Sequence, residues 1–196
     1  MSSCGCQKGT ASASTDVVIS TMEIIAKQIE ETSKAVSSDS ISDMLTILLT
    51  ARENGNCVFV TGAGRSGLMG RAFAMRLMHM GFKAYVIGET VTPSVQSGDV
   101  LVAISGSGNT KSVVEVANKC KTVGASVIAV TSKDGSDLKK LSAANVILSA
   151  GAASNTPMGT AFEIMALVYL DSVIMQLIEL TGVTEDEMKA RHANTE

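Results

Sequence analysis

Short apolar segments alternate with helical stretches along the middle of the chain, and this alternation constrains the fold more than any other feature. The first segment, Cys57-Val-Phe-Val-Thr61, is typical of a strand that is covered on both faces. A glycine-rich turn and a helical stretch follow it, and the unit then recurs. The predicted strands span residues 57–61, 84–87, 100–104, 126–130 and 146–148. Helical crossovers between them predict an α/β fold, a three-layer α/β/α sandwich with a five-stranded parallel sheet in the flavodoxin-like order 2-1-3-4-5.

Helical periodicity marks the segments that cover this sheet. The predicted helices span residues 17–36, 40–52, 66–80, 110–123 and 160–180. Thr184 is a typical N-cap for a last short helix that runs to Met188.

The 196 residues fit one well-packed domain and are short for two. We therefore predict a single domain over residues 16–196. Residues 1–15 are rich in Ser, Gly and Ala, and we expect a flexible tail there. The pair Cys4 and Cys6 lies in this tail without a second pair that would complete a metal site, so we interpret both as mobile thiols.

Charge and hydropathy exclude several classes of protein. The chain has 16 basic and 19 acidic residues, a net charge of -3, and its basic residues are scattered, which argues against a nucleic-acid or anionic-lipid surface. The apolar stretch over residues 164–180 is interrupted by Asp171 and Glu179, so we expect a buried helix and no membrane span. No secretory signal is visible at the N-terminus, and we expect a cytoplasmic protein.

The first loop, Gly62-Ala-Gly64-Arg65-Ser66-Gly67, follows a predicted strand and opens a helix. Backbone N–H groups at such a place bind anions. The loop also matches the dinucleotide fingerprint G-x-G-x-x-G, with Glu89 as a possible ribose-binding acid, although Glu89 lies further on than the usual distance of about 20 residues. Its arginine fits a surface position and a phosphate contact equally well. A nucleotide site and a sugar phosphate site both remain open.

The second loop, Ser105-Gly106-Ser107-Gly108-Asn109-Thr110, follows the third predicted strand and opens another helix. Its three hydroxyls and glycine-rich backbone suit a terminal phosphate, and a dinucleotide site does not require such a second loop. The alternative is an ordinary helix cap. In the predicted strand order both loops meet at one crevice, at the carboxyl ends of the strands.

These motifs resemble the sugar isomerase (SIS) domain, a phosphosugar-binding fold. Further segments resemble the 6-phospho-3-hexuloisomerase family within it. They are Gly64-Arg-Ser-Gly with Arg76-Leu-Met-His-Met-Gly-Phe82, Gly88-Glu-Thr-Val-Thr-Pro-Ser94, Pro157-Met-Gly-Thr-Ala-Phe-Glu163 and Lys189-Ala-Arg-His-Ala-Asn194. The resemblance covers the chain from about residue 17 to its end.

The resemblance implies interconversion of D-arabino-hex-3-ulose 6-phosphate and fructose 6-phosphate, in formaldehyde fixation by the ribulose monophosphate pathway or in pentose phosphate supply. It implies a small-molecule sugar phosphate as ligand and no cofactor or metal. The residues predicted to bind substrate are Gly64, Arg65, Ser66, Glu89, Ser105, Gly106, Ser107, Gly108 and Thr110. Two other classes of protein remain possible. One is a non-catalytic phosphosugar-sensing SIS module, of the type joined to a DNA-binding domain, although we expect no such domain in the tail of this sequence. The other is a nucleotide-binding protein.

Moving a ketone from C3 to C2 needs a base that takes the hydrogen from the neighbouring carbon. Glu163 is the predicted catalytic base, because it lies in the segment that resembles the isomerase, beside a short loop after the last predicted strand. The competing interpretation is structural. Thr160-Ala-Phe-Glu163 reads as a capping box, in which the glutamate turns back onto its own helix.

His79 and His192 are the two histidines, and we predict that both are catalytic. The functional interpretation of His79 is proton transfer at a sugar hydroxyl or opening of the fructose ring. His79 lies near a helix end, where the helix dipole also favours a cation. His192 lies close to the chain end, where fraying is usual. The family pattern implies that it reaches a site, that of a neighbouring subunit.

The predicted helix over residues 160–180 is apolar nearly all round, and one sheet face cannot bury all of it. We expect the remainder to form an oligomer interface, in a homotetramer built as a dimer of dimers.

Overall fold

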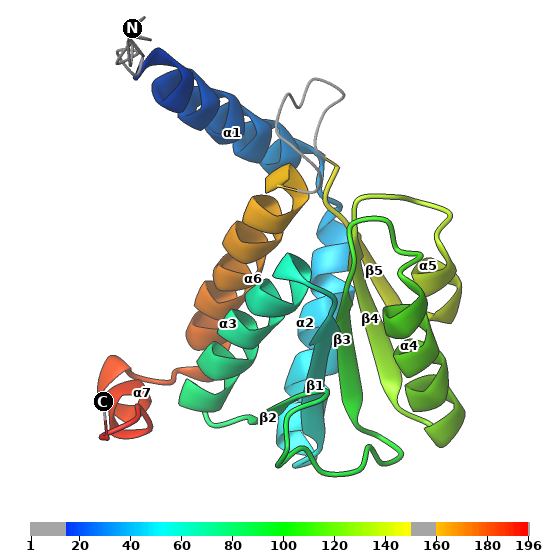
Figure 1. Ribbon diagram of the computed structural model, residues 1–196. Coiled ribbons are helices and arrows are strands. Elements are labelled where there is room, and N and C mark those ends of the chain that lie inside the picture. Colours follow the sequence, from blue (N-terminus) through cyan, green and yellow to red (C-terminus); the bar gives the residue numbers. More distant parts are fainter. Residues whose placement is uncertain (1–14, 150–159, 196) are drawn as a thin grey trace, which may run out of the picture.

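The computed structural model describes residues 15–149 and 160–195. At its centre, five parallel strands lie in the order β2-β1-β3-β4-β5 (Figure 1). They are β1 (Cys57–Gly62), β2 (Lys83–Val86), β3 (Val100–Ile104), β4 (Ser126–Thr131) and β5 (Ala144–Ile147). Val58 in β1 pairs with Ala84 in β2 and with Val100 in β3. The predicted sheet and its order are confirmed, and the ends of β1 and β3 are neighbours at the switch point.

Helices cover both faces of this sheet. They are α1 (Asp16–Ala35), α2 (Ser38–Glu53), α3 (Arg65–His79), α4 (Lys111–Val123), α5 (Asp137–Leu141), α6 (Thr160–Thr181) and α7 (Glu185–Ala190). Because successive side chains of a strand point to opposite faces, Val58 and Val60 join a core with α2, α3 and α6, whereas Phe59 joins a core with α4 and α5. The three predicted layers are therefore present.

The predicted boundaries differ from the observed ones by one or two residues. The exception is α5, which the sequence analysis missed because five residues are too few to show a helical period. Ser136 caps α5 by accepting a hydrogen bond from the backbone N–H of Lys139. At α7 the predicted cap is confirmed, since Thr184 and Glu187 form a reciprocal capping box.

Helix α6 packs against α1, α2 and α3, and its buried side chains confirm the predicted core position. Within the described part of the chain, α6 is the one helix whose length and apolar composition would suffice to cross a membrane. Half of its most apolar window is buried inside the fold, and the core helix of a soluble protein passes the same test.

Helix α1 projects beyond the sheet layers, with its first turns furthest from the core (Figure 1). Its exposed apolar side chains are Val17, Val18, Ile19 and Met22. The tail that we predicted before this helix lies outside the described residues up to position 14, as do Cys4 and Cys6.

Candidate active site

The first loop, residues 62–67, is built from glycines that have no room for a side chain. A Cβ on Gly67 would lie 2.6 Å from the backbone oxygen of Gly62, and a Cβ on Gly62 would lie 2.9 Å from the backbone N of Gly67. Gly64 has φ 56° and ψ -132°, a conformation essentially restricted to glycine. This close return of the backbone starts α3 directly at the end of β1.

The second loop, residues 105–110, carries its hydroxyls at the end of β3. Ser105 is buried, and its Oγ lies 2.8 Å from Oγ1 of Thr110, so one hydroxyl donates to the other and one hydroxyl hydrogen remains for a ligand. Ser107 is exposed and accepts a hydrogen bond from the backbone N–H of Asn109. Gly108 has φ +64°, and a Cβ there would lie 2.3 Å from Oγ of Ser136.

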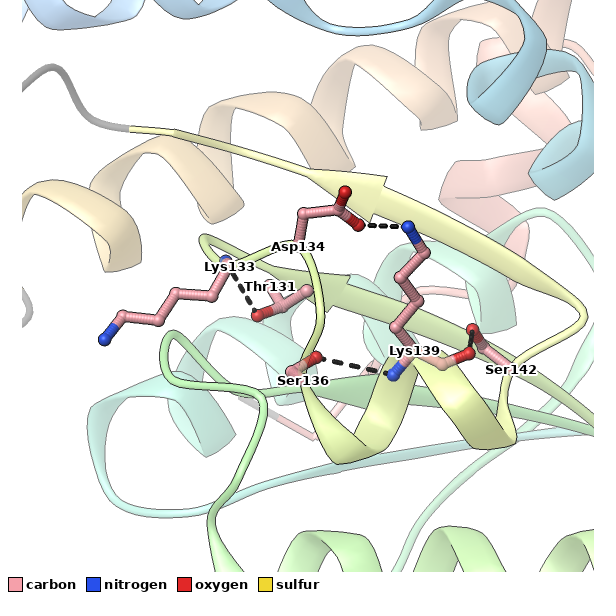
Figure 2. A network of polar contacts seen from close by, with 6 residues as sticks. All are labelled: Thr131, Lys133, Asp134, Ser136, Lys139 and Ser142. Carbon is pink, nitrogen blue, oxygen red and sulfur yellow. Dashed lines mark hydrogen bonds and ion pairs between the residues drawn. The ribbon is translucent and has the colours of Figure 1, made fainter.

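Residues at the end of β4 and the start of α5 contact the second loop and fix its backbone. The backbone oxygen of Gly106 accepts hydrogen bonds from the backbone N–H of Ser132 at 3.0 Å and from its Oγ at 2.7 Å. Figure 2 shows Ser136, the N-cap of α5, and Thr131, which accepts a hydrogen bond from the backbone N–H of Lys133. Asp134 and Lys139 form an ion pair in the same segment. The sequence analysis did not identify Thr131, Ser132 and Ser136 as contacts of the second loop, because neither strand periodicity nor the loop motif indicates such contacts.

Helix charges support both loops as anion sites. Helices α3 and α4, which open at the two loops, have no acidic residue in their first turns, whereas each of the other five described helices has at least one there. A carboxylate in the first turn offsets the positive end of the helix dipole. The dipoles of α3 and α4 therefore remain available for an anionic ligand.

Glu163 is brought to these loops by the start of α6. Its Oε2 lies 2.6 Å from Nε of Arg65 in the first loop. The preceding residue, Phe162, contacts the second loop closely enough that a Cβ on Gly106 would lie 3.0 Å from its ring. The carboxylate is therefore directed toward the first loop, and Glu163 and Arg65 lie together as predicted site residues.

Glu89 lies at a different part of the same sheet edge, after β2. Its Oε1 pairs with Nη2 of Arg71 at 2.6 Å. The sequence gives no sign of this pairing, because the helical position of Arg71 does not show that its side chain reaches the turn after β2. Both side chains are about half exposed, at 57% for Arg71 and 48% for Glu89.

The two histidines lie together, at the opposite end of α3. The rings of His79 and His192 stack with centroids 5.2 Å apart. Nη1 of Arg191 donates to the backbone oxygen of His79 at 3.1 Å, which ties the chain end to α3. Since an α-helix rises about 1.5 Å per residue, His79 lies about 21 Å along the axis from Arg65. One protomer therefore does not bring the histidines to the two loops.

Burial lowers the pKa of His79 below its ordinary value of 6.5, and His192 and Arg76 lower it further by charge repulsion. The imidazole is therefore neutral near pH 7.

The functional groups near the two loops are a carboxylate, a guanidinium, hydroxyls and backbone N–H groups. Across residues 15–149 and 160–195, no three His, Cys, Asp or Glu side chains are grouped so that they could hold a metal ion. Such a set can bind a phosphate and transfer protons on carbon.

The doubly wound sheet, with anion-binding loops at the carboxyl ends of β1 and β3, defines a class of α/β phosphate-binding proteins. The SIS domain family matches residues 53–177, and the chain belongs to this family.

Proteins with similar sequences indicate which members of the SIS domain family this chain resembles. The 3-hexulose-6-phosphate isomerase of Methanocaldococcus jannaschii is 38% identical over 173 residues, which cover 88% of this chain and 96% of that protein. The Bacillus subtilis protein of the same name is 35% identical over 181 residues, 88% of this chain and 95% of that one. A crystal structure from Methanococcus jannaschii, which infers this molecular function, has a TM-score of 0.82 at 36% identity and covers 89% of this chain and 98% of its own. This name is a synonym of 6-phospho-3-hexuloisomerase, so the predicted resemblance is confirmed.

Proposed function

We propose that this protein interconverts D-arabino-hex-3-ulose 6-phosphate and fructose 6-phosphate. The observation that carries the proposal is similarity to several 3-hexulose-6-phosphate isomerases, at 35–41% identity and over most of the chain. The placement of Glu163 supports it from the structure, because Glu163 contacts Arg65 of the first loop and follows Phe162, which contacts the second loop, and this reaction needs a base next to a bound sugar phosphate. The same relatives favour an isomerase over a sensing module.

The substrate phosphate binds, in this proposal, at the second loop. The hydroxyls of Ser105, Ser107 and Thr110 and the backbone of Gly106 and Gly108 surround the start of α4. Hydrogen bonds to a charged group contribute about 1.5 to 3 kcal/mol each, so a few of them are enough to hold a sugar phosphate. Gly64, Arg65 and Ser66 would contact the sugar from the first loop.

Glu163 acts as the base in the proposed reaction. Starting from the 3-ketose, its carboxylate takes the hydrogen from C2, and the electron pair forms the C2–C3 double bond of an enediolate. The O2 hydroxyl then loses its proton, O3 gains one, and the proton held by Glu163 returns to C3, which leaves a hydroxyl at C3 and the ketone at C2. Arg65, at 2.6 Å from Glu163, lies where it can stabilise the enediolate oxygen.

The hydroxyl protons need a second group, and we propose that His79 and His192 of one protomer supply it to the site of another. The exposed apolar side chains support such an assembly. On α3 and α6 they include Leu68, Met75, Met78, Val168 and Met175. Together with the exposed face of α1 they offer surface for the expected homotetramer.

Several finer expectations remain predictions. They are a reaction without metal or cofactor, no nucleic-acid or membrane partner, a cytoplasmic location and a place in formaldehyde fixation or pentose phosphate supply. The single domain over residues 16–196 is likewise a proposal.

Proton NMR of fructose 6-phosphate in D₂O tests the reaction directly. We expect loss of the C3 hydrogen signal and growth of a 3-ketose, with Glu163→Gln protein as the control. Exchange at C1 would indicate an aldose-ketose isomerase. Saturable binding without exchange at either carbon would indicate the sensing module.

A further inference from the structure

A polar cavity of about 260 Å³ lies between the ends of β1 and β2, beside the first loop. Thr61, Gly62, Gly64 and Gly67 line one part of it, and Arg71 and Ile87 line another. Ligand pockets usually measure about 300 to 1,000 Å³, so this cavity is small enough to take part of a substrate and too small for a large one.

Arg71 connects this cavity to a carboxylate. Its Nη2 pairs with Oε1 of Glu89 at 2.6 Å, which holds Glu89 next to the cavity. The turn that carries Glu89 is itself fixed, because Ile87 N–H donates to the Val60 oxygen at 3.0 Å and Thr92 N–H donates to the Glu89 oxygen at 3.1 Å. The side chains of Arg71 and Glu89 therefore both extend from hydrogen-bonded backbone, in α3 and in the turn after β2.

Stability does not explain this pair. Ion pairs between side chains as exposed as these contribute about 0 to 1 kcal/mol. A guanidinium only donates hydrogen bonds and a carboxylate only accepts them, whereas a sugar hydroxyl does both. The pair therefore matches a hydroxylated carbon chain, while the charge of Glu89 would repel a phosphate.

The distance to the second loop matches the length of a hexose phosphate. Neighbouring strands lie about 4.8 Å apart, so the end of β2 lies roughly 10 Å from the end of β3, with β1 between them. An extended six-carbon chain with its phosphate is about as long. With the phosphate at the second loop, the middle carbons would pass Glu163 and Arg65 beside β1.

We propose that the cavity of Arg71 and Glu89 is the subsite for the hydroxylated C1 end of the sugar phosphate. The inference rests on the proposed function, because it takes the phosphate to lie at the second loop. Arg71 donates to the terminal hydroxyl and Glu89 accepts from it, so the pair selects ligands that reach this end of the site.

Calorimetry with two ligands on the full-length protein tests the subsite. Arg71→Ala and Glu89→Gln are each expected to weaken fructose 6-phosphate binding by about tenfold or more, because each removes a hydrogen bond to a charged group. Binding of glycerol 3-phosphate, which lacks the distal carbons, should change less than twofold. Arg71→Lys, which keeps the charge, should retain part of the affinity.

The exposed ion pair of Lys34 and Glu30 on α1 provides the matched control, and Lys34→Ala and Glu30→Gln should leave both ligands unaffected. Unchanged fructose 6-phosphate affinity in the Arg71 and Glu89 variants would overturn the subsite, as would an equal loss for both ligands, which would indicate a distorted loop. Failure of the proposed function is a separate result. Wild-type protein would then bind fructose 6-phosphate without exchanging its C3 hydrogen, and the affinities would still decide the subsite.

Discussion

The two ends of α3 are equipped for different chemistry. At its start, Arg65 pairs with Glu163 beside two glycine-rich loops, and no acidic side chain of the first turn offsets the helix dipole. At its last residue, His79 stacks on His192 and the chain end is tied down by Arg191. Charged groups define the first end, and a buried neutral imidazole defines the second.

Neither end of α3 therefore carries all the groups that the proposed reaction needs. In the proposed reaction the first end supplies the base that takes the hydrogen from carbon, and the histidines of the second end supply the group for hydroxyl protons. The anion-binding loops lie at the first end, away from the histidines. Because α3 holds them about 21 Å apart, only another protomer can bring a histidine pair to a pair of loops.

Glu163→Gln gives the largest expected effect. The amide keeps the shape of the side chain but cannot take a proton, so kcat should fall by about 10² to 10⁴, the usual contribution of a general base. Exchange at C3 in D₂O measures it. Glu179→Gln, an exposed carboxylate on the same helix, is the control and should be active. A loss smaller than tenfold would favour the capping interpretation of Glu163.

Subunit mixing decides whether the two ends cooperate across protomers. His192→Ala alone should lower kcat by about tenfold or more, since it removes a proton-transfer group. Coexpression of this variant with Glu163→Gln should give activity well above that of either alone, because some sites then combine an intact glutamate with an intact histidine. A coexpressed mixture as inactive as its parents would place the histidines outside the site.

Arg191→Ala should have a smaller effect. It removes the guanidinium that donates to the oxygens of His79 and Glu187, so His192 loses its fixed place over His79. We expect kcat to fall about three- to tenfold, which corresponds to about 0.6 to 1.4 kcal/mol and to the net contribution of an ordinary hydrogen bond. Arg191→Lys should recover part of the activity, which separates positioning from general destabilisation. Unaltered kcat in Arg191→Ala would contradict a role for the tied chain end.

The smallest expected effect is a pH dependence of stability. The pKa of His79 is lower in the folded protein than in the unfolded chain, where it is 6.5. As the pH falls below 6.5 the unfolded chain therefore binds the proton first, and the free energy of unfolding decreases. Thermal unfolding at pH 7.5 and 5.5 should show a larger drop for wild type than for His79→Asn. Equal drops would mean that His79 does not stay neutral on folding.

Local signals in the sequence were enough for the elements and for the loops. Strand and helix limits agree within two residues because apolar periodicity is a local property, and the capping box of Thr184 is read from four consecutive positions. The glycines of the first loop were recognised for the same reason. Helix α5 was missed because its five residues are too few to show a helical period.

The parallel sheet, its order, the family and the residues at the ends of β1 and β3 can all be predicted from the amino-acid sequence. Which of those residues contact one another depends on the packed fold. It paired Glu163 with Arg65 and Arg71 with Glu89, and it brought Arg191 to the backbone of His79, 112 positions away. The physical reason is that periodicity and turn chemistry act between neighbours in the chain, whereas charges and rings find partners only after the helices have packed on the sheet.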